Sequence, residues 1–281
     1  MTPVTIGARG LALAVAACGA GAACTTTSRP LLICHNANCA GDRAPDADDT
    51  LDALRGSLAL RTPDGAVVFD GIELDSVWDR GLGRCTFAHV PDPHAPDFLE
   101  AAGLVVAHVA GAPAGAAHGP AFYVKIELKT DVGGGAAHRP DEIAGHVACV
   151  TGAARAVIDA GAASHNPVIP IFDSDDPALL AAVAASGFSA DPAPAVLYET
   201  GWGAALPPGF TPQIVTLGWF DDPRPLTWDR SLEHLTTAEG GGLLIWARSP
   251  APRDLAAMLA HEPAYLGVNN VEEARGLIDA L

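Results

Sequence analysis

Short apolar runs alternate with helical stretches rich in alanine and leucine from Leu31 to Val268, and this alternation allows few folds. The runs are nearly continuous in apolar residues, which is typical of strands buried on both faces of a parallel sheet. Several helical stretches begin at Asp or Pro, as helix N-termini do. Eight or nine strands in a chain of this length predict an α/β fold, a single (β/α)8 TIM barrel, with a doubly wound open sheet as the alternative.

The pattern also sets where the individual elements are expected. Strands are expected at Leu31–Cys34, Val67–Leu74, Cys85–Val90, Ala121–Leu128, Pro167–Phe172, Ala195–Leu197, Gln213–Leu217, Leu243–Trp246 and Tyr265–Val268. Helices are expected at Asp49–Arg55, Pro140–Ala160, Pro177–Ser186 and Pro252–His261. No glycine-rich phosphate loop follows the first run, which disfavours a nucleotide-binding fold.

The first 24 residues differ from the rest of the chain, because Arg9 is their only charge. The apolar run Leu11–Ala17 is too short to span a bilayer, so residues 1–24 are expected to be a signal peptide. Val15–Cys18 resembles a bacterial lipoprotein cleavage box with Cys18 as the lipidated residue, and a plain signal peptide cut nearby is the alternative. The barrel is then expected over residues 29–281 of an exported protein, periplasmic, anchored to a membrane through Cys18, or extracellular.

The chain is strongly acidic, with 16 Lys and Arg against 33 Asp and Glu and a formal charge of −17. Such a surface repels nucleic acids, so no nucleic-acid partner is expected. An anionic substrate would need a local positive charge, which a bound divalent cation supplies. Outside the leader the cysteines are Cys34, Cys39, Cys85 and Cys149. A disulfide involving Cys39 and Cys85 is expected because both flank the polar cluster described next, although spacing alone leaves the pairing open.

Polar residues gather where the apolar runs end. His35 and Asn36 follow the first run, and His89 lies near the end of the third. The second run carries the Glu-x-Asp pair of Glu73 and Asp75 at its end. The fourth run carries Lys125, Glu127 and Lys129. Residues two apart on a strand share a face, so Glu73 and Asp75 point the same way, as do Lys125, Glu127 and Lys129. Inward carboxylates that converge are best explained by a hard cation with oxygen ligands, Mg²⁺ or Ca²⁺.

Each of these motifs also has a structural interpretation. A single Glu-x-Asp on a strand most often lies on a face exposed to solvent. A histidine at a strand end most often packs against its neighbours or caps a backbone group. The Lys-x-Glu-x-Lys pattern is also typical of an exposed edge strand. The order His, Glu-x-Asp, His, Glu-x-Lys on successive strands favours a functional site over these alternatives.

This order resembles the glycerophosphodiester phosphodiesterase superfamily, including its sphingomyelinase D-like and phosphatidylinositol-phospholipase C-like branches. Asp48-Asp49-Thr50 lies where the acidic-Asn-Thr helix start of that family is found, and Asn36 replaces its usual arginine. The resemblance extends over residues 30–281 and is most specific in the first half. It implies a TIM barrel that hydrolyses phosphodiesters with the help of a divalent cation, Mg²⁺ or Ca²⁺.

The resemblance also implies roles for individual residues and partners. The substrate would be a glycerophosphodiester or a (lyso)phospholipid, and the protein is expected to be a monomer. One alternative is a non-catalytic relative that binds a phosphorylated ligand or a partner; another is an unrelated barrel glycosidase that uses Glu73 and Glu127. The implied general acid and base are His35 and His89, the metal ligands Glu73, Asp75 and Glu127, and the substrate-binding residues Asn36, Lys125, Lys129 and Trp246.

Overall fold

The computed structural model describes residues 29–41, 43–113, 121–132, 137–188, 197–201, 214–219 and 242–280. The leader, with the predicted signal segment and Cys18, lies outside them. The strands are β1 (Leu31–Cys34), β2 (Gly71–Asp79), β3 (Arg84–Phe87), β4 (Phe122–Leu128), β5 (Val168–Asp173), β6 (Leu197–Gly201), β7 (Ile214–Gly218), β8 (Gly242–Ala247) and β9 (Tyr265–Val268). The helices are α1 (Leu51–Leu58), α2 (Phe98–Gly111), α3 (Pro140–Ser164), α4 (Pro177–Ala185), α5 (Pro252–Leu259) and α6 (Val271–Asp279), with short 3-10 turns η1 (His35–Ala37) and η2 (Pro45–Ala47).

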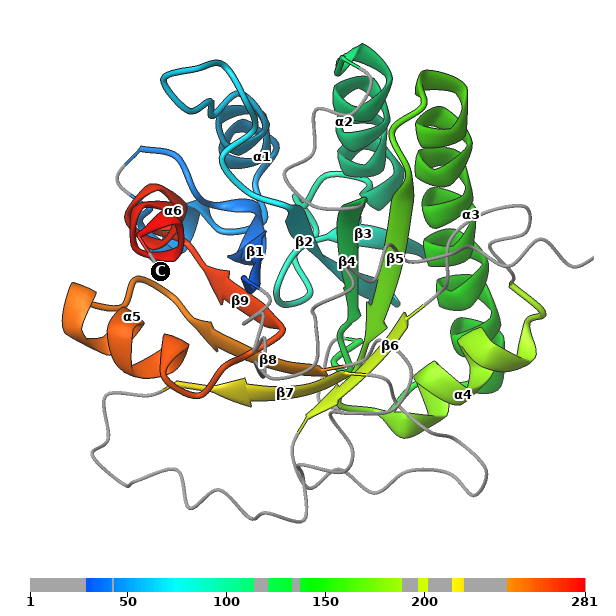
Figure 1. The fold of residues 1–281 in the computed structure, drawn as a ribbon. Coiled ribbons are helices and arrows are strands. Elements are labelled where there is room, and N and C mark those ends of the chain that lie inside the picture. Colours follow the sequence, from blue (N-terminus) through cyan, green and yellow to red (C-terminus); the bar gives the residue numbers. More distant parts are fainter. Residues whose placement is uncertain are drawn as a thin grey trace, which may run out of the picture.

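A curled parallel sheet forms the centre of the molecule, with helices on its outer side (Figure 1). The parallel strands follow the order β1-β9-β8-β7-β6-β5-β4-β2, and β1 also pairs with β2. The predicted α/β class with a parallel sheet is therefore confirmed. The complete eightfold repeat of strand and helix stays a prediction, since the segments that follow β6 and β7 lie outside the described residues.

The expected parallel strand at Cys85–Val90 is wrong. β3 instead runs antiparallel to β2, pairing Ser76–Asp79 with Arg84–Phe87 beyond the region where β2 pairs with β1. Only the tight turn at residues 80–83 connects the two strands, and Gly83 there has φ of 63°. A parallel pair needs a crossover of a dozen or more residues, so this connection can form only a hairpin. His89 consequently lies in the loop after β3 and not on a strand of the parallel sheet.

Two helices, α2 and α6, were not expected from the sequence. α2 carries apolar residues on most of its surface, so it lacks the stripe by which an amphipathic helix is identified. α3 is long and apolar enough to cross a membrane by length and composition. Its apolar residues such as Val150 and Val157 are instead buried against α2 and the sheet.

The expected disulfide between Cys39 and Cys85 is also wrong, because the structure pairs Cys34 with Cys39 and Cys85 with Cys149. Cys34 ends β1, and the turn at His35–Ala37 brings Cys39 back to a Cα separation of 5.9 Å. Cys85 on β3 lies under α3, which carries Cys149. Sequence spacing did not contain this information, since it depends on the hairpin and on the packing of α3.

Close contact between β2 and β4 positions the polar residues of both strands. A side chain at Gly71 would place its Cβ 2.7 Å from Tyr123, so only glycine permits this approach. The register then sets Glu73 beside Lys125 and Asp75 beside Glu127. The charged residues predicted on the two strands therefore meet side by side.

Candidate active site

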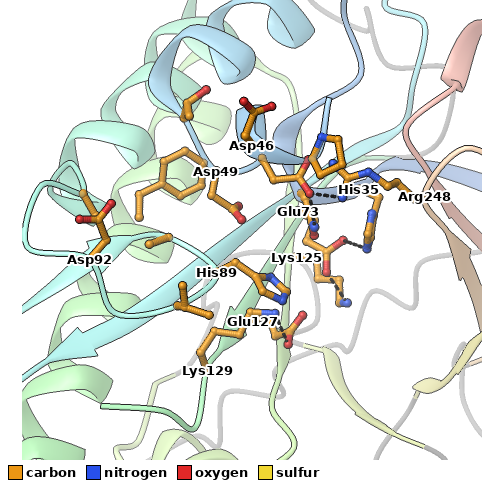
Figure 2. A pocket seen from close by; sticks show the side chains of 18 of the residues that line it. His35, Asp46, Asp49, Glu73, His89, Asp92, Lys125, Glu127, Lys129 and Arg248 are labelled. Atoms are coloured by element: carbon orange, nitrogen blue, oxygen red, sulfur yellow. Dashed lines mark hydrogen bonds and ion pairs between the residues drawn. The ribbon is translucent and has the colours of Figure 1, made fainter. Parts of the chain in front are cut away.

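A pocket of about 830 Å³ opens at the carboxyl ends of the parallel strands, where active sites of barrel enzymes lie. Every predicted site residue lines it except Asp75, which is fully buried and contacts pocket residues through hydrogen bonds. Figure 2 shows the side chains of His35, Glu73, Lys125, His89 and Glu127 gathered together, with Asp92 set apart from them. The lining residues taken from the prediction are His35, Asn36, Glu73, His89, Lys125, Glu127, Lys129 and Trp246.

His35 is held in a fixed orientation immediately after β1. Its Nδ1 lies 3.0 Å from Oδ1 of Asn269, and its ring stacks on Trp246 with centroids 5.1 Å apart. The amide of Asn269 donates to the backbone oxygens of His35 and Asn38, so its Oδ1 is the atom that faces the imidazole. Nδ1 of His35 is therefore the donor, and Nε2, 3.9 Å from Oε2 of Glu73, can exchange a proton.

His89 is held by a buried carboxylate. Its Nδ1 lies 2.7 Å from Oδ2 of Asp75, while more than half of its side chain is exposed. Burial raises the pKa of Asp75, but Lys129 and His89 outweigh it and hold that pKa well below its usual range. Because the ionised carboxylate only accepts hydrogen bonds, Nδ1 of His89 donates, and in the neutral form of the ring the lone pair is on Nε2.

Two lysines neutralise part of the acidic cluster. Nζ of Lys125 lies 2.7 Å from Glu73 and 3.0 Å from Asp173, and Nζ of Lys129 lies 3.0 Å from Asp75 and 2.6 Å from Glu127. The carboxylates of this cluster outnumber its lysines. The remaining negative charge attracts a cation.

The pKa values reflect this excess of negative charge. Burial, followed by Asp75 and Asp173, raises the pKa of Glu127 to about 8. Burial tends to lower the pKa of Lys129, but Asp75 and Glu127 outweigh it and raise it above its ordinary value. Burial also opposes ionisation of Glu73, yet Lys125 and His35 lower its pKa overall.

Glu73, Asp75 and Glu127 fit a divalent cation. Each offers an oxygen atom, and these atoms lie within 4.8 Å of one another. Oδ1 of Asp75 is fully buried and has no hydrogen-bond partner among the described residues. A donor set made only of carboxylate oxygens suits Mg²⁺ or Ca²⁺.

Several pocket residues were not assigned a role from the sequence. Asp173, at the end of β5, pairs with Lys125. Its position directly after an apolar run was the sequence signal that could have identified it. Asp48 accepts hydrogen bonds from Asn36 at 3.2 Å and from Arg248, so the amide of Asn36 is partly engaged by the protein itself. For Asn269 only the family resemblance suggested that it could reach the site, and the pairing of β1 with β9 brings it to His35.

Comparison with known proteins gives a consistent result for the fold. No protein-family model and no curated protein matches the sequence. Among solved structures, a glycerophosphodiester phosphodiesterase from Parabacteroides distasonis superposes with a TM-score of 0.58 at 11% identity, covering 90% of this chain and 98% of that one. A provisionally assigned glycerophosphoryl diester phosphodiesterase from Silicibacter pomeroyi gives 0.57 at 15% identity over 89% and 93%. A phosphodiesterase from Oleispira antarctica, in complex with the product sn-glycerol-3-phosphate, gives 0.54 at 14% identity over 89% and 97%.

This chain has the fold of the glycerophosphodiester phosphodiesterases. The predicted resemblance to that superfamily is confirmed at the level of the fold, over nearly the whole length of the neighbours. The fold of the glycerophosphodiester phosphodiesterases does not by itself assign an activity, which rests on the residues of the pocket.

Proposed function

We propose that this protein is a metal-dependent phosphoric diester hydrolase that acts on glycerophosphodiesters or (lyso)phospholipids. The observation that carries the proposal is the position of His35 and His89 in one pocket, in contact with a carboxylate cluster that can hold a cation. The fold of neighbouring phosphodiesterases, one of them in complex with sn-glycerol-3-phosphate, supports the same reaction class. The proposed catalytic domain is a complete (β/α)8 barrel over residues 29–281.

The two histidines act as general acid and general base. His89 has its Nδ1–H directed at Asp75, so Nε2 is able to take a proton from the attacking hydroxyl group. His35 has its Nδ1–H directed at Asn269, and Nε2 is able to give a proton to the leaving oxygen. The two histidines exchange the roles of acid and base in the reverse reaction or in a second hydrolytic step.

Glu73, Asp75 and Glu127 are proposed to hold the divalent cation, Mg²⁺ or Ca²⁺. When bound, the cation stabilises negative charge on a non-bridging phosphate oxygen. Lys129 and Lys125 add fixed positive charge at the floor of the pocket. Asn36 and Trp246 are proposed to contact the substrate, Asn36 through its amide and Trp246 through the ring that also stacks on His35.

The arrangement of the histidines disfavours a glycosidase. That alternative needs two carboxyl groups at a defined separation, one of them with a raised pKa, and it gives the histidines no role. Here His89 contacts Asp75 at 2.7 Å and His35 lies 3.9 Å from Glu73. A proton-transfer pair beside a cation site favours phosphodiester cleavage instead.

The proposal also covers the cellular location of the protein and its oligomeric state. The leader supports export to the bacterial periplasm or beyond, with attachment to a membrane through a lipidated Cys18 as one form. The functional unit is proposed to be a monomer. The acidic surface disfavours nucleic acid as the phosphodiester substrate.

The test is hydrolysis of a panel of glycerophosphodiesters and lysophospholipids by the purified protein in Mg²⁺, Ca²⁺ or EDTA. Turnover should be lost in EDTA and fall by about 10²–10⁴-fold in His35→Ala and His89→Ala. His94→Ala is the matched control, because His94 is an exposed histidine on the same pocket with no assigned role. Turnover that persists in EDTA or in both variants would exclude this mechanism. No turnover on any substrate, with metal binding that Glu73→Ala abolishes, would favour the non-catalytic relative.

A further inference from the structure

One buried acid in the pocket is unused by the mechanism above. Asp49 lies immediately before Thr50, the residue that caps α1, and is only 3% exposed. Neither of its carboxylate oxygens has a hydrogen-bond partner in the described part of the chain. Buried carboxylates are costly unless they are paired or bind a cation, so a side chain in this state points to a missing ligand.

The backbone of Asp49 is also held in an unusual conformation. Its φ is 56°, in the left-handed region that side-chain-bearing residues seldom adopt. Its N–H donates to the backbone oxygen of Asn36 at 3.3 Å, which ties the residue to the turn that carries His35. The chain thus holds Asp49 in an uncommon backbone conformation, although its carboxylate gains no hydrogen bond among the described residues.

Asp49 belongs to a second group of potential ligands. One ligand atom from each of Asp49, Asp75 and His89 lies within 4.8 Å of the other two. Asp75 is shared with the group of Glu73 and Glu127, whereas Asp49 belongs to the second group only. Asp49 and His89 lie on the side of the pocket away from Arg248 (Figure 2).

The chemistry of the two groups differs. Glu73, Asp75 and Glu127 offer oxygen alone, which suits Mg²⁺ or Ca²⁺. The second group replaces one carboxylate by an imidazole, and nitrogen ligands favour transition metals such as Zn²⁺.

We infer that Asp49, Asp75 and His89 form a second cation site, selective for a transition metal such as Zn²⁺, whose occupation competes with catalysis. Binding there would engage the imidazole of His89 and the shared carboxylate of Asp75. The inhibitory consequence rests on the proposed function, because it assumes that His89 transfers a proton. The binding site itself stands independently of any activity.

The test is calorimetric titration of Zn²⁺ into the purified, untagged protein at saturating Mg²⁺. We expect one Zn²⁺ to bind per chain, and Asp49→Asn to weaken that binding at least about tenfold, the effect typical of losing a metal-site residue. Asp46→Asn is the matched control, since Asp46 is an exposed acid of the same pocket outside both ligand groups. Asp49→Gly is the second variant, because glycine suits a φ of 56° and keeps the test valid if the asparagine variant misfolds.

The outcomes separate the two proposals. Zn²⁺ binding that is equally strong in Asp49→Asn, Asp49→Gly and Asp46→Asn would overturn the second site. If Zn²⁺ binding depends on Asp49 but the protein turns over no substrate, the second site is supported and the proposed function is wrong. Turnover that Zn²⁺ inhibits at a concentration raised at least about tenfold in the Asp49 variants would support both.

Discussion

Glu73 and Lys125 are register partners on β2 and β4, and Nζ of Lys125 donates to Oε1 of Glu73 at 2.7 Å. Both side chains are almost completely buried, and Lys125 also pairs with Asp173 at 3.0 Å. One ammonium group therefore serves two buried carboxylates. A charge that is buried without its partner is strongly destabilising, which makes this lysine important for stability as well as for the site.

The first prediction concerns this lysine. Lys125→Met should lower the free energy of unfolding by about 3–5 kcal/mol in the absence of divalent cations, because Glu73 and Asp173 lose their common partner. Urea denaturation measures this. The double variant Glu73→Gln/Lys125→Met should recover part of the loss, and a single-variant change below about 1 kcal/mol would contradict the pairing.

The second prediction concerns the orientation of His35. Asn269→Ala removes the acceptor at Nδ1 of His35 and should lower kcat about 10–100-fold with a smaller change in KM, as expected for a positioning residue. Asn269→Asp keeps the acceptor oxygen and should recover part of the rate. Steady-state kinetics over a range of pH gives both readouts. An equal loss in the two variants would indicate that Asn269 serves only to bind backbone oxygens.

The third prediction concerns pH and lies outside the pocket. His146 on α3 is buried and contacts Oγ of Ser76 at 2.9 Å. Burial, together with His138, lowers the pKa of His146 from 6.5 to about 3. The imidazole stays neutral in the folded protein, while the unfolded chain takes up a proton below pH 6.5, so stability should fall as the pH falls from 6.5 toward 3.

His146→Gln removes this titration. Between pH 7 and pH 4 the free energy of unfolding of the wild type should decrease by about 3 kcal/mol more than that of the variant, a difference set by the two pKa values. Urea denaturation at the two pH values gives the comparison. Parallel pH dependence in both proteins would show that His146 is already protonated or exposed in the folded state.

The fourth prediction concerns the buried contact between α6 and the sheet. Arg275 is buried and donates to Oδ2 of Asp70 at 2.7 Å and to the backbone oxygen of Val68 at 2.9 Å. The same Asp70 oxygen accepts from the backbone N–H of Leu32 on β1. Arg275→Met should therefore lower the free energy of unfolding by about 3–5 kcal/mol.

An exposed ion pair provides the control. Arg29 lies 3.3 Å from Asp279 with both side chains more than half exposed. Arg29→Met should change the free energy of unfolding by less than about 1 kcal/mol, because solvent screens the pair. Chemical denaturation of both variants gives the values, and similar effects in the two would argue against a structural role for the buried pair.

Local patterns in the sequence determined the parallel α/β class and most of the strands. An alternation of apolar runs and helical stretches depends only on neighbouring residues, and so does the rule that residues two apart share a strand face. These rules were enough to predict that Glu73 and Asp75 point together, and that Lys125, Glu127 and Lys129 do. Charged residues on buried strands were informative because burying a charge costs free energy unless an opposite charge or a bound cation compensates it.

Tertiary structure alone decided the contacts between distant segments. The antiparallel course of β3, the pairing of Cys85 with Cys149, and the contact of Asn269 with His35 each depend on how whole elements pack. The burial of Asp49 also depends on packing, since nothing in the sequence Asp48-Asp49-Thr50 shows that Asp49 is buried and not exposed to solvent. Sequence patterns report which face of an element is buried, whereas partners across the fold are chosen by packing that no local period encodes.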